Sequence, residues 1–199
     1  MAIQTLEQPV TEHTWSPPAQ GQWTYADYQR LPDDGWRYEV IEGDLHMTPA
    51  PSTKHQTVGF NLKLAIGSFV KANKSGCVLD APIDVRLGKF ADPVQPDILF
   101  IRQERLGIIK GGWIEGAPDW IVEILSPSNW LDDRRTKYRL YARAGVGEYW
   151  IVDPDQRQVE VFVLRHGDYA LVGRFGPGER AHSEVLAGFQ IDVDEMCPA

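Results

Sequence analysis

Apolar residues recur along this chain at two spacings, one typical of helices and the other typical of strands. Between residues 53 and 75 they recur every three or four positions, which predicts a long helix that ends before Gly76. The apolar stripe of this helix consists of Val58, Leu62, Ala65, Ile66 and Phe69. Shorter apolar runs bounded by Gly, Pro or Asp predict strands instead. These runs cover residues 77–87, 95–101, 119–126 and 148–152.

The remaining segments predict shorter elements around this core. A second long helix is expected to begin at Asp132 or Asp133 and to end before Gly145. The others are a helix over residues 24–31, a hairpin over 36–47, a connection with one helical turn over 104–116, a second hairpin over 159–172 and an extended segment over 189–193. The order helix, three strands, helix, strand predicts an α/β fold, with helices flanking a mixed central sheet and additional antiparallel hairpins.

Length and composition indicate a single globular domain. Of the 199 residues, 43% are hydrophobic, which suits one sizeable core. Residues 1–22 are rich in Pro, Gln, Thr and Glu, so we expect a mobile N-terminal tail followed by one domain over residues 23–199. No run approaches the roughly 18 apolar residues of a membrane helix, and no signal peptide is recognised. With only Cys77 and Cys197, we expect a cytoplasmic protein without a disulfide framework or a membrane partner.

The net charge narrows the function classes without deciding between them. A formal charge of -8 counts against a protein that coats nucleic acid non-specifically, because phosphate binding is driven by basic surface. A nuclease remains compatible with this charge. A site that collects carboxylates for a divalent cation makes the bare protein more acidic, and the bound metal offsets part of that charge.

Glu123 is the first candidate for chemistry. It interrupts the apolar run Trp-Ile-Val-Glu-Ile-Leu at residues 120–125, which is typical of a strand buried on both faces. A carboxylate there is unfavourable unless it meets a cation, a metal or several hydrogen-bond donors. A Glu that faces the surface at a strand end, or a purely structural ion pair, is the alternative; flanking apolar residues favour a functional role.

Asp97 is the expected partner of Glu123. It opens a comparable apolar segment over residues 96–101, and two carboxylates on adjacent core strands can hold one hard cation, which prefers oxygen ligands and keeps several waters. Asp119 is a competitor because it repeats the Pro-Asp dipeptide. It lies four residues before Glu123, about 13 Å away along one strand, which is too far to share an ion.

The second long helix contributes a candidate lysine. Arg135, Arg139 and Arg143 are spaced by four and predict one solvated basic face. At about 100° per residue, Lys137 points about 160° away from Arg139, and so does Tyr141 on the other side. A lysine directed inward could polarise the scissile phosphate or lower the pKa of an attacking water. The alternative is that its long stem carries the ammonium group to the rim of the core.

Three further residues are weaker candidates. Glu39 alternates with Tyr38 in the first hairpin, and an ordinary strand charge is an equally good interpretation. His55 stands in the first turn of the long helix, where a surface or capping role is the more common one. Ser126 follows the strand of Glu123 and could hydrogen-bond a substrate or end the turn.

These segments together resemble the bacterial Uma-two family of restriction-endonuclease-like proteins. The resemblance covers about residues 23–195, and its most specific piece is YARAGVGEYWIVDP at residues 141–154. Its other pieces are residues 37–43, 49–52, 54–56, 94–97, 123–128 and 133–137. The family is assigned to the PD-(D/E)XK nuclease superfamily, whose members mostly cut phosphodiester bonds with magnesium.

The resemblance implies a mixed four-stranded sheet between helices and a site with defined roles. Asp97 and Glu123 are expected to bind Mg²⁺, or Mn²⁺ in its place, and Lys137 to supply the third catalytic group. Glu39 and His55 are expected to be an additional acid and base around the same cleft. The sequence departs from the superfamily motif at Leu125, where the lysine normally stands two residues after the acid. Whether this chain has a complete active site therefore depends on whether Lys137 points inward.

The leading hypothesis is a metal-dependent endonuclease that acts on DNA, as a homodimer. The alternative is a catalytically inactive nuclease fold that serves as a nucleic-acid-binding or protein-interaction module, which the acidic pI and Leu125 favour. A third hypothesis treats the paired carboxylates as the general acid and base of a sugar hydrolase. The lysine partner and the lack of a broad aromatic cleft pattern argue against it.

Overall fold

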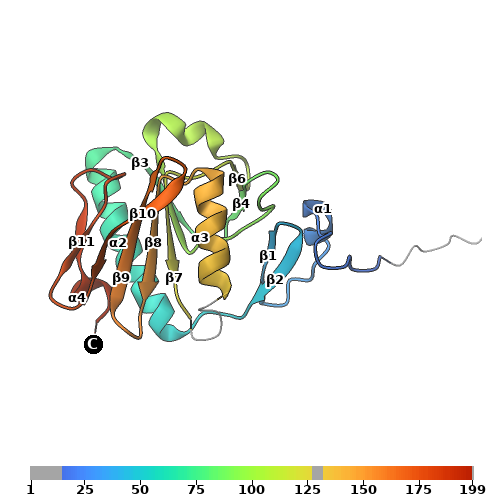
Figure 1. Cartoon of the computed structure of the whole chain (residues 1–199), viewed down its shortest axis with the longest axis horizontal. Helices are drawn as coiled ribbons and strands as arrows, with labels where there is room; N and C mark the ends of the chain where they lie inside the picture. The colour runs from blue at the N-terminus through green and yellow to red at the C-terminus, as the bar shows by residue number, and fades with distance from the viewer. Residues whose placement is uncertain (1–14, 127–131, 199) are drawn as a thin grey trace, which may run out of the picture.

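The structure is a computed structural model that describes residues 15–126 and 132–198 (Figure 1). Its centre is a six-stranded sheet with the strand order β10-β9-β8-β7-β5-β3. These strands are β3 (Gly76–Asp80), β5 (Ile98–Arg102), β7 (Trp120–Ile124), β8 (Glu148–Asp153), β9 (Gln158–Arg165) and β10 (Asp168–Phe175). Only β7 and β8 are parallel among these neighbours. The predicted α/β fold with a mixed central sheet is confirmed.

The parallel pair of the central sheet follows from the connection between its strands. Helix α3 (Asp132–Ala144) lies between β7 and β8 in the sequence, and a parallel pair requires such a crossover. The sheet has six strands where the resemblance implied four, because the hairpin β9–β10 continues the sheet from the edge of β8. The predicted N-terminal tail falls mostly on residues 1–14, outside the described part of the chain.

Two hydrophobic clusters lie on opposite faces of the sheet. Helix α2 (Thr53–Asn73) covers one face with its predicted stripe, of which Val58, Leu62 and Ile66 are fully buried. Helix α3 covers the other face with Leu140 and Tyr141 (Figure 1). Successive residues of β7 alternate between the two clusters, as the strand period of two requires. None of the described helices is long and apolar enough to cross a membrane.

The C-terminal segment completes the face that α2 covers. It consists of β11 (Arg180–His182), β12 (Gln190–Asp192) and α4 (Val193–Met196). The extended segment predicted over residues 189–193 corresponds to β12, which pairs with β11. Ala181, Ile191 and Met196 are buried in the same cluster as α2.

The N-terminal hairpin stands beside α3 as a separate two-stranded sheet. After the short helix α1 (Tyr25–Tyr28), it consists of β1 (Arg37–Ile41) and β2 (Asp44–Thr48). Hydrogen bonds from the Val40 amide to Pro93 O (2.8 Å) and from the Asp92 amide to Val40 O (2.9 Å) fix it to the segment that precedes β5. Its turn requires Gly43, which has φ +86° and lies so close to Gly21 that a Cβ atom would overlap it. This docking places the inward side chains of β1 over the end of the central sheet.

One predicted strand is wrong. The segment 77–87 does not form a single strand but divides into β3 and β4 (Asp84–Arg86). Pro82 lies between them and has no N–H to donate to a continuing ladder. Strand β4 instead pairs in parallel with β6 (Trp113–Glu115), a strand inside the predicted connection 104–116. The helical turn expected in that connection is the 3-10 helix η1 (Gln103–Ile108).

Candidate active site

The sheet register places Asp97 and Glu123 side by side. Strands β5 and β7 are antiparallel, with Ile98 opposite Val122, so one further step places Asp97 opposite Glu123. Directly opposed residues of an antiparallel pair have their Cβ atoms about 4.5–5.5 Å apart and share a face of the sheet. Both residues are 8% exposed. The backbone alone therefore brings two buried carboxylates together.

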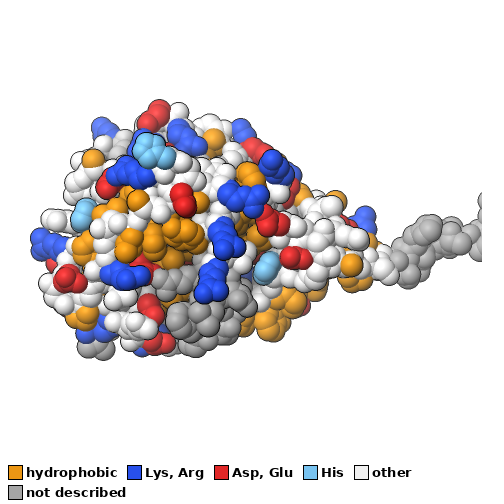
Figure 2. Space-filling model, in the orientation of Figure 1, with side chains coloured by type: hydrophobic (Ala, Val, Ile, Leu, Met, Phe, Trp, Pro, Cys, Tyr) orange, Lys and Arg blue, Asp and Glu red, His pale blue; other side chains and the backbone are white. Residues whose placement is uncertain are grey.

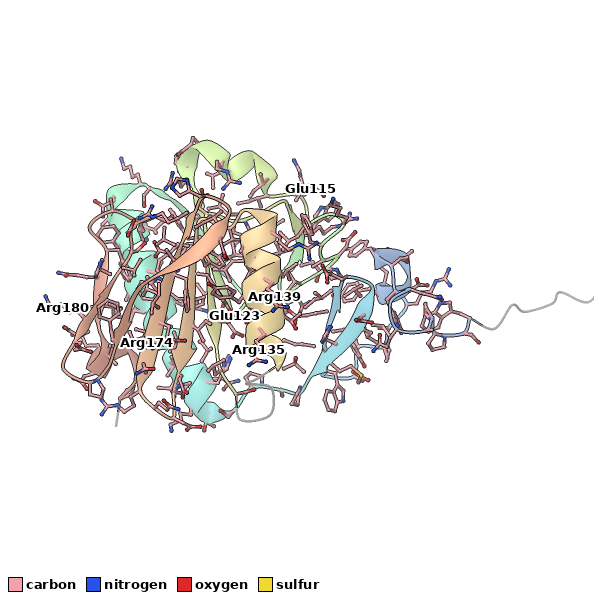
Figure 3. All side chains as sticks on the ribbon, viewed as in Figure 1. Glu115, Glu123, Arg135, Arg139, Arg174 and Arg180 are labelled. Atoms are coloured by element: carbon pink, nitrogen blue, oxygen red, sulfur yellow. The ribbon has the colours of Figure 1, made fainter. Side chains whose placement is uncertain are left out.

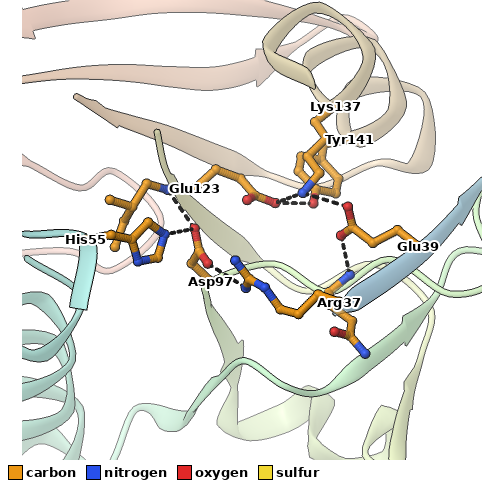
Figure 4. A network of polar contacts seen from close by, with 9 residues as sticks. Arg37, Glu39, His55, Asp97, Glu123, Lys137 and Tyr141 are labelled. Carbon is orange, nitrogen blue, oxygen red and sulfur yellow. Dashed lines mark hydrogen bonds and ion pairs between the residues drawn. The ribbon is translucent and has the colours of Figure 1, made fainter. Parts of the chain in front are cut away.

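Lys137 lies between two of the buried acids. Its Nζ is 3.1 Å from Glu123 Oε1 and 3.1 Å from Glu39 Oε2 (Figure 4). The residue is 5% exposed, so its stem does not carry the charge to solvent. Arg135 and Arg139 of the same helix are exposed. The structure thus directs Lys137 inward from α3, which is the first of the two orientations that the helical spacing left open, and places its ammonium group beside Glu123.

Tyr141 contacts Glu123 from the next turn of α3. Its hydroxyl donates to Glu123 Oε1 at 2.6 Å. Complete burial raises the pKa of Tyr141 well above its ordinary value, and the negative charges of Glu123 and Glu39 raise it further. The phenol therefore remains protonated and acts as a permanent hydrogen-bond donor that orients Glu123.

Glu39 joins the cluster from the N-terminal hairpin. Its Oε1 accepts a hydrogen bond from the Gln95 amide at 2.6 Å, while its Oε2 faces Lys137. It is 4% exposed, the lowest value among the three acids. Because the Gln95 amide holds one oxygen, the other is kept in place beside the ammonium group.

Asp97 accepts three hydrogen bonds from protein donors. Arg37 donates to Oδ1 at 2.9 Å, and the Ile124 amide donates to Oδ2 at 2.9 Å. His55 Nε2 lies 3.1 Å from Oδ2. Burial raises the pKa of Asp97, but the hydrogen bond and charge of His55, the charge of Arg37 and the Ile124 amide together outweigh it and lower the pKa. Asp97 is therefore an anion at neutral pH.

His55 owes its position to the start of α2. Ser52 is the N-cap of this helix, and its side chain accepts a hydrogen bond from the His55 amide. In the first turn of α2, His55 is therefore turned toward the sheet, and it is 7% exposed. The surface role that is common for such a histidine does not apply here.

Asp119 is not part of this cluster. It precedes β7 at the opposite end from Glu123, where it accepts a hydrogen bond from the Arg102 amide at 2.9 Å and pairs with Arg105 at 2.8 Å. It is as buried as Asp97, at 8% exposed. Its role is to fix the segment that follows β5, and Asp97 alone of the two Pro-Asp acids stands beside Glu123.

A pocket of about 280 Å³ is lined by the five candidate residues Glu39, His55, Asp97, Glu123 and Lys137. Ser126, Gln95 and Arg37 also line it. Arg37 and Gln95 were not predicted to be site residues, although their spacing from the candidate acids is a signal for both. Each lies two residues before a candidate acid, Arg37 before Glu39 and Gln95 before Asp97, and residues two apart on an extended chain point the same way.

The donor set fits a hard divalent cation. Asp97, Glu123 and Glu39 oppose two permanently cationic side chains, Arg37 and Lys137, so the cluster has one negative charge in excess when His55 is neutral. Within the described ranges no group of three or more His, Cys, Asp or Glu side chains is arranged to enclose a metal. A cation bound by Asp97 and Glu123 would therefore take its other ligands from water or substrate, as Mg²⁺ commonly does.

Comparisons with known proteins relate this geometry to a family. The family model described as "Uma2: Putative restriction endonuclease" matches residues 25–194. The crystal structure of a "putative nuclease belonging to DUF820 from Anabaena variabilis" has a TM-score of 0.72 and 22% sequence identity, and the match covers 87% of this chain and 97% of that one. This likeness establishes a shared fold. No curated protein matches the chain.

Proposed function

The chain belongs to the Uma2 family, described as "Putative restriction endonuclease", and we propose that it is a metal-dependent endonuclease that hydrolyses phosphodiester bonds of DNA. The observation that carries the proposal is the buried constellation of Asp97, Glu123 and Lys137 in one pocket. A buried ion pair adds little net stability, and an ammonium group beside two carboxylates supplies the positive charge that phosphoryl transfer needs at this kind of site.

Each residue of the site has a separate proposed role in hydrolysis. Asp97 and Glu123 would hold Mg²⁺, or Mn²⁺ in its place, which when bound supplies Lewis-acid polarisation of the phosphate and a more acidic water. Lys137 would place its ammonium group against the negative charge that develops on the phosphoryl oxygens. Glu39 orients Lys137 through their 3.1 Å contact, and Tyr141 orients Glu123. A role of Glu39 or His55 as general base stays a prediction.

Two exposed arginines support a nucleic-acid substrate. Arg135 and Arg139 lie on the outer side of α3, in a stripe of basic side chains over that helix (Figures 2 and 3). Among the described residues neither has an acidic partner, whereas Arg143 on the same stripe pairs with Glu42. The stripe lies on the side of α3 opposite Lys137, so its guanidinium groups could hold backbone phosphates near the helix that bears the catalytic lysine.

The experiment that tests the proposal is magnesium-dependent cleavage of plasmid and single-stranded DNA. The native chain is compared with Asp97→Ala and with Asp119→Ala, a matched control that removes an equally buried, arginine-paired acid of the same dipeptide. We expect cleavage by the native chain and by Asp119→Ala, corrected for the folded fraction, and loss of cleavage in Asp97→Ala. Equal loss in both variants would refute a catalytic role for Asp97.

A second candidate function rests on the hydrogen bonds of Asp97. Both of its oxygens accept from protein donors, which is also what a purely structural acid would do. Under this alternative the chain is an inactive nuclease fold that binds nucleic acid or protein. DNA binding that is independent of metal, with no cleavage under any metal condition, would favour it over the enzyme.

A further inference from the structure

A second pocket adjoins the candidate active site and has a different character. Its volume is about 380 Å³, and it lies next to the first pocket, because Arg37, Pro51, His55, Asp97 and Ile124 line both. Its remaining walls come from one face of α2, from the end of β3 with the two residues that follow it, and from the first residue of β5. They are Gln56, Gly59, Phe60, Lys63, Asp80, Ala81, Pro82 and Ile98.

The wall formed by α2 is a single helical face with an exposed aromatic ring. Gln56, Gly59, Phe60 and Lys63 follow the spacing of three and four residues that aligns side chains on a helix. Phe60 is 61% exposed, the largest value among the exposed large hydrophobic residues. Gly59 beside it lowers helix stability relative to alanine, and a Cβ atom at this position would lie 3.4 Å from Ile124 Cδ1.

The charged side chains that line this pocket are paired with one another. Arg37, which also lines the active-site pocket, is paired with Asp97. Lys63 is paired with Asp80, so their charges largely offset each other. The other lining residues are mostly apolar and include Phe60, Pro82 and Ile98. A phosphate would gain little there, whereas a flat, uncharged group would bury apolar surface against the ring.

We propose that this second pocket receives the nucleobase of a nucleotide next to the scissile phosphate, with Phe60 as its stacking surface. The inference rests on the proposed function, since it assumes that a phosphodiester lies at Asp97 and Glu123. A base can enter a pocket only when it has left the duplex stack. The substrate class is therefore a single strand, a frayed end or a site with an unpaired base, in preference to an intact duplex.

Binding of two single-stranded probes, measured in EDTA so that no strand is cut, tests the proposal. One probe is a decamer of thymidines, and the other is a fully abasic decamer with the same phosphates. We expect the native chain to prefer the thymidine decamer. We expect Phe60→Ala to reduce that preference by about 5- to 150-fold, the range that stacking of one base on an aromatic side chain supplies.

Leu64→Ala is the matched control. Leu64 lies one turn further along α2, is 58% exposed and does not line the pocket. Its replacement should leave the preference for bases unchanged. The proposal would be overturned if both replacements had an equal effect or if the native chain showed no preference for the thymidine decamer. It would also be overturned if both variants changed from dimer to monomer, because that result would assign this apolar face to a contact between two copies of the chain.

The inference and the proposed function fail in different measurements. If Phe60→Ala abolishes the preference for the thymidine decamer while the native chain cuts no DNA, base binding in this pocket is supported and the endonuclease activity is refuted. If the native chain cuts DNA and Phe60→Ala retains the full preference, base binding is refuted and the endonuclease activity is supported.

Discussion

Replacement of Asp97 by asparagine should lower the stability of the protein in a manner that depends on pH. Asparagine keeps the shape of the side chain but removes its charge and offers one acceptor oxygen in place of two. Asp97 now accepts from Arg37 on one oxygen and from His55 and the Ile124 amide on the other. Either orientation of the asparagine amide therefore turns its NH₂ group toward at least one protein donor.

The magnitude follows from the burial of these partners. Removal of one member of a fully buried ion pair costs about 3–5 kcal/mol, and one hydrogen bond to a charged group contributes about 1.5–3 kcal/mol. Arg37 retains some access to solvent, with 22% of its side chain exposed, which reduces the penalty. We expect Asp97→Asn to lower the free energy of unfolding at pH 7 by about 2–4 kcal/mol.

The sign of the pH dependence is set by the lowered pKa of Asp97. A carboxyl group whose pKa is lower in the folded state binds fewer protons there than in the unfolded chain, so its contribution to stability grows with pH. The contribution is complete above the ordinary aspartate pKa of about 3.9 and is lost as the pH falls toward the folded pKa. The difference between the native chain and Asp97→Asn should therefore shrink in acid.

Urea denaturation between pH 3 and pH 8, followed by circular dichroism, measures this difference. The native chain is compared with Asp97→Asn at each pH, under conditions where both unfold reversibly. A difference that stays constant over the whole range, or a variant that is more stable than the native chain at pH 7, would refute the electrostatic account of Asp97.

Two further predictions concern α3. Tyr141→Phe removes the 2.6 Å hydrogen bond to Glu123, so we expect the free energy of unfolding to fall by about 1–3 kcal/mol and magnesium affinity, measured by calorimetry, to fall with it; unchanged affinity would contradict the orienting role of Tyr141. The double variant Arg135→Ala/Arg139→Ala should leave urea denaturation unchanged because both side chains are exposed. It should reduce the slope of log affinity for duplex DNA against log salt by about 1.8, at about 0.9 for each lost phosphate contact, and an unchanged slope would refute these contacts.

The acids and the lysine of the site could be predicted because local patterns carry them. Glu123 interrupts a buried apolar strand, Asp97 opens another, and Lys137 opposes Arg139 on its helix. Each pattern lies within one element, and burial of that element fixes the direction of the side chain. The α/β fold class followed for the same reason, from the order of helical and strand periods.

The supporting residues could not be predicted because their positions depend on tertiary contacts. Arg37 reaches Asp97 only because β1 docks through Val40 and Pro93 onto the segment before β5. No periodicity in the sequence specifies that docking. Likewise, the interruption at Pro82 is local, but the pairing of the separated strand β4 with β6 joins segments about thirty residues apart.

Lys137 of α3 is the proposed catalytic lysine. Single-turnover cleavage of DNA by the native chain and by Lys137→Ala, across a range of magnesium concentrations, tests this role. Because Lys137 contacts Glu123 without being a metal ligand in this account, we expect cleavage by the variant to fall by a factor on the order of 10²–10³, the usual loss when one transition-state contact is removed, and to stay low at saturating magnesium. Cleavage at the native rate by a folded Lys137→Ala chain, or full recovery at high magnesium, would contradict the account.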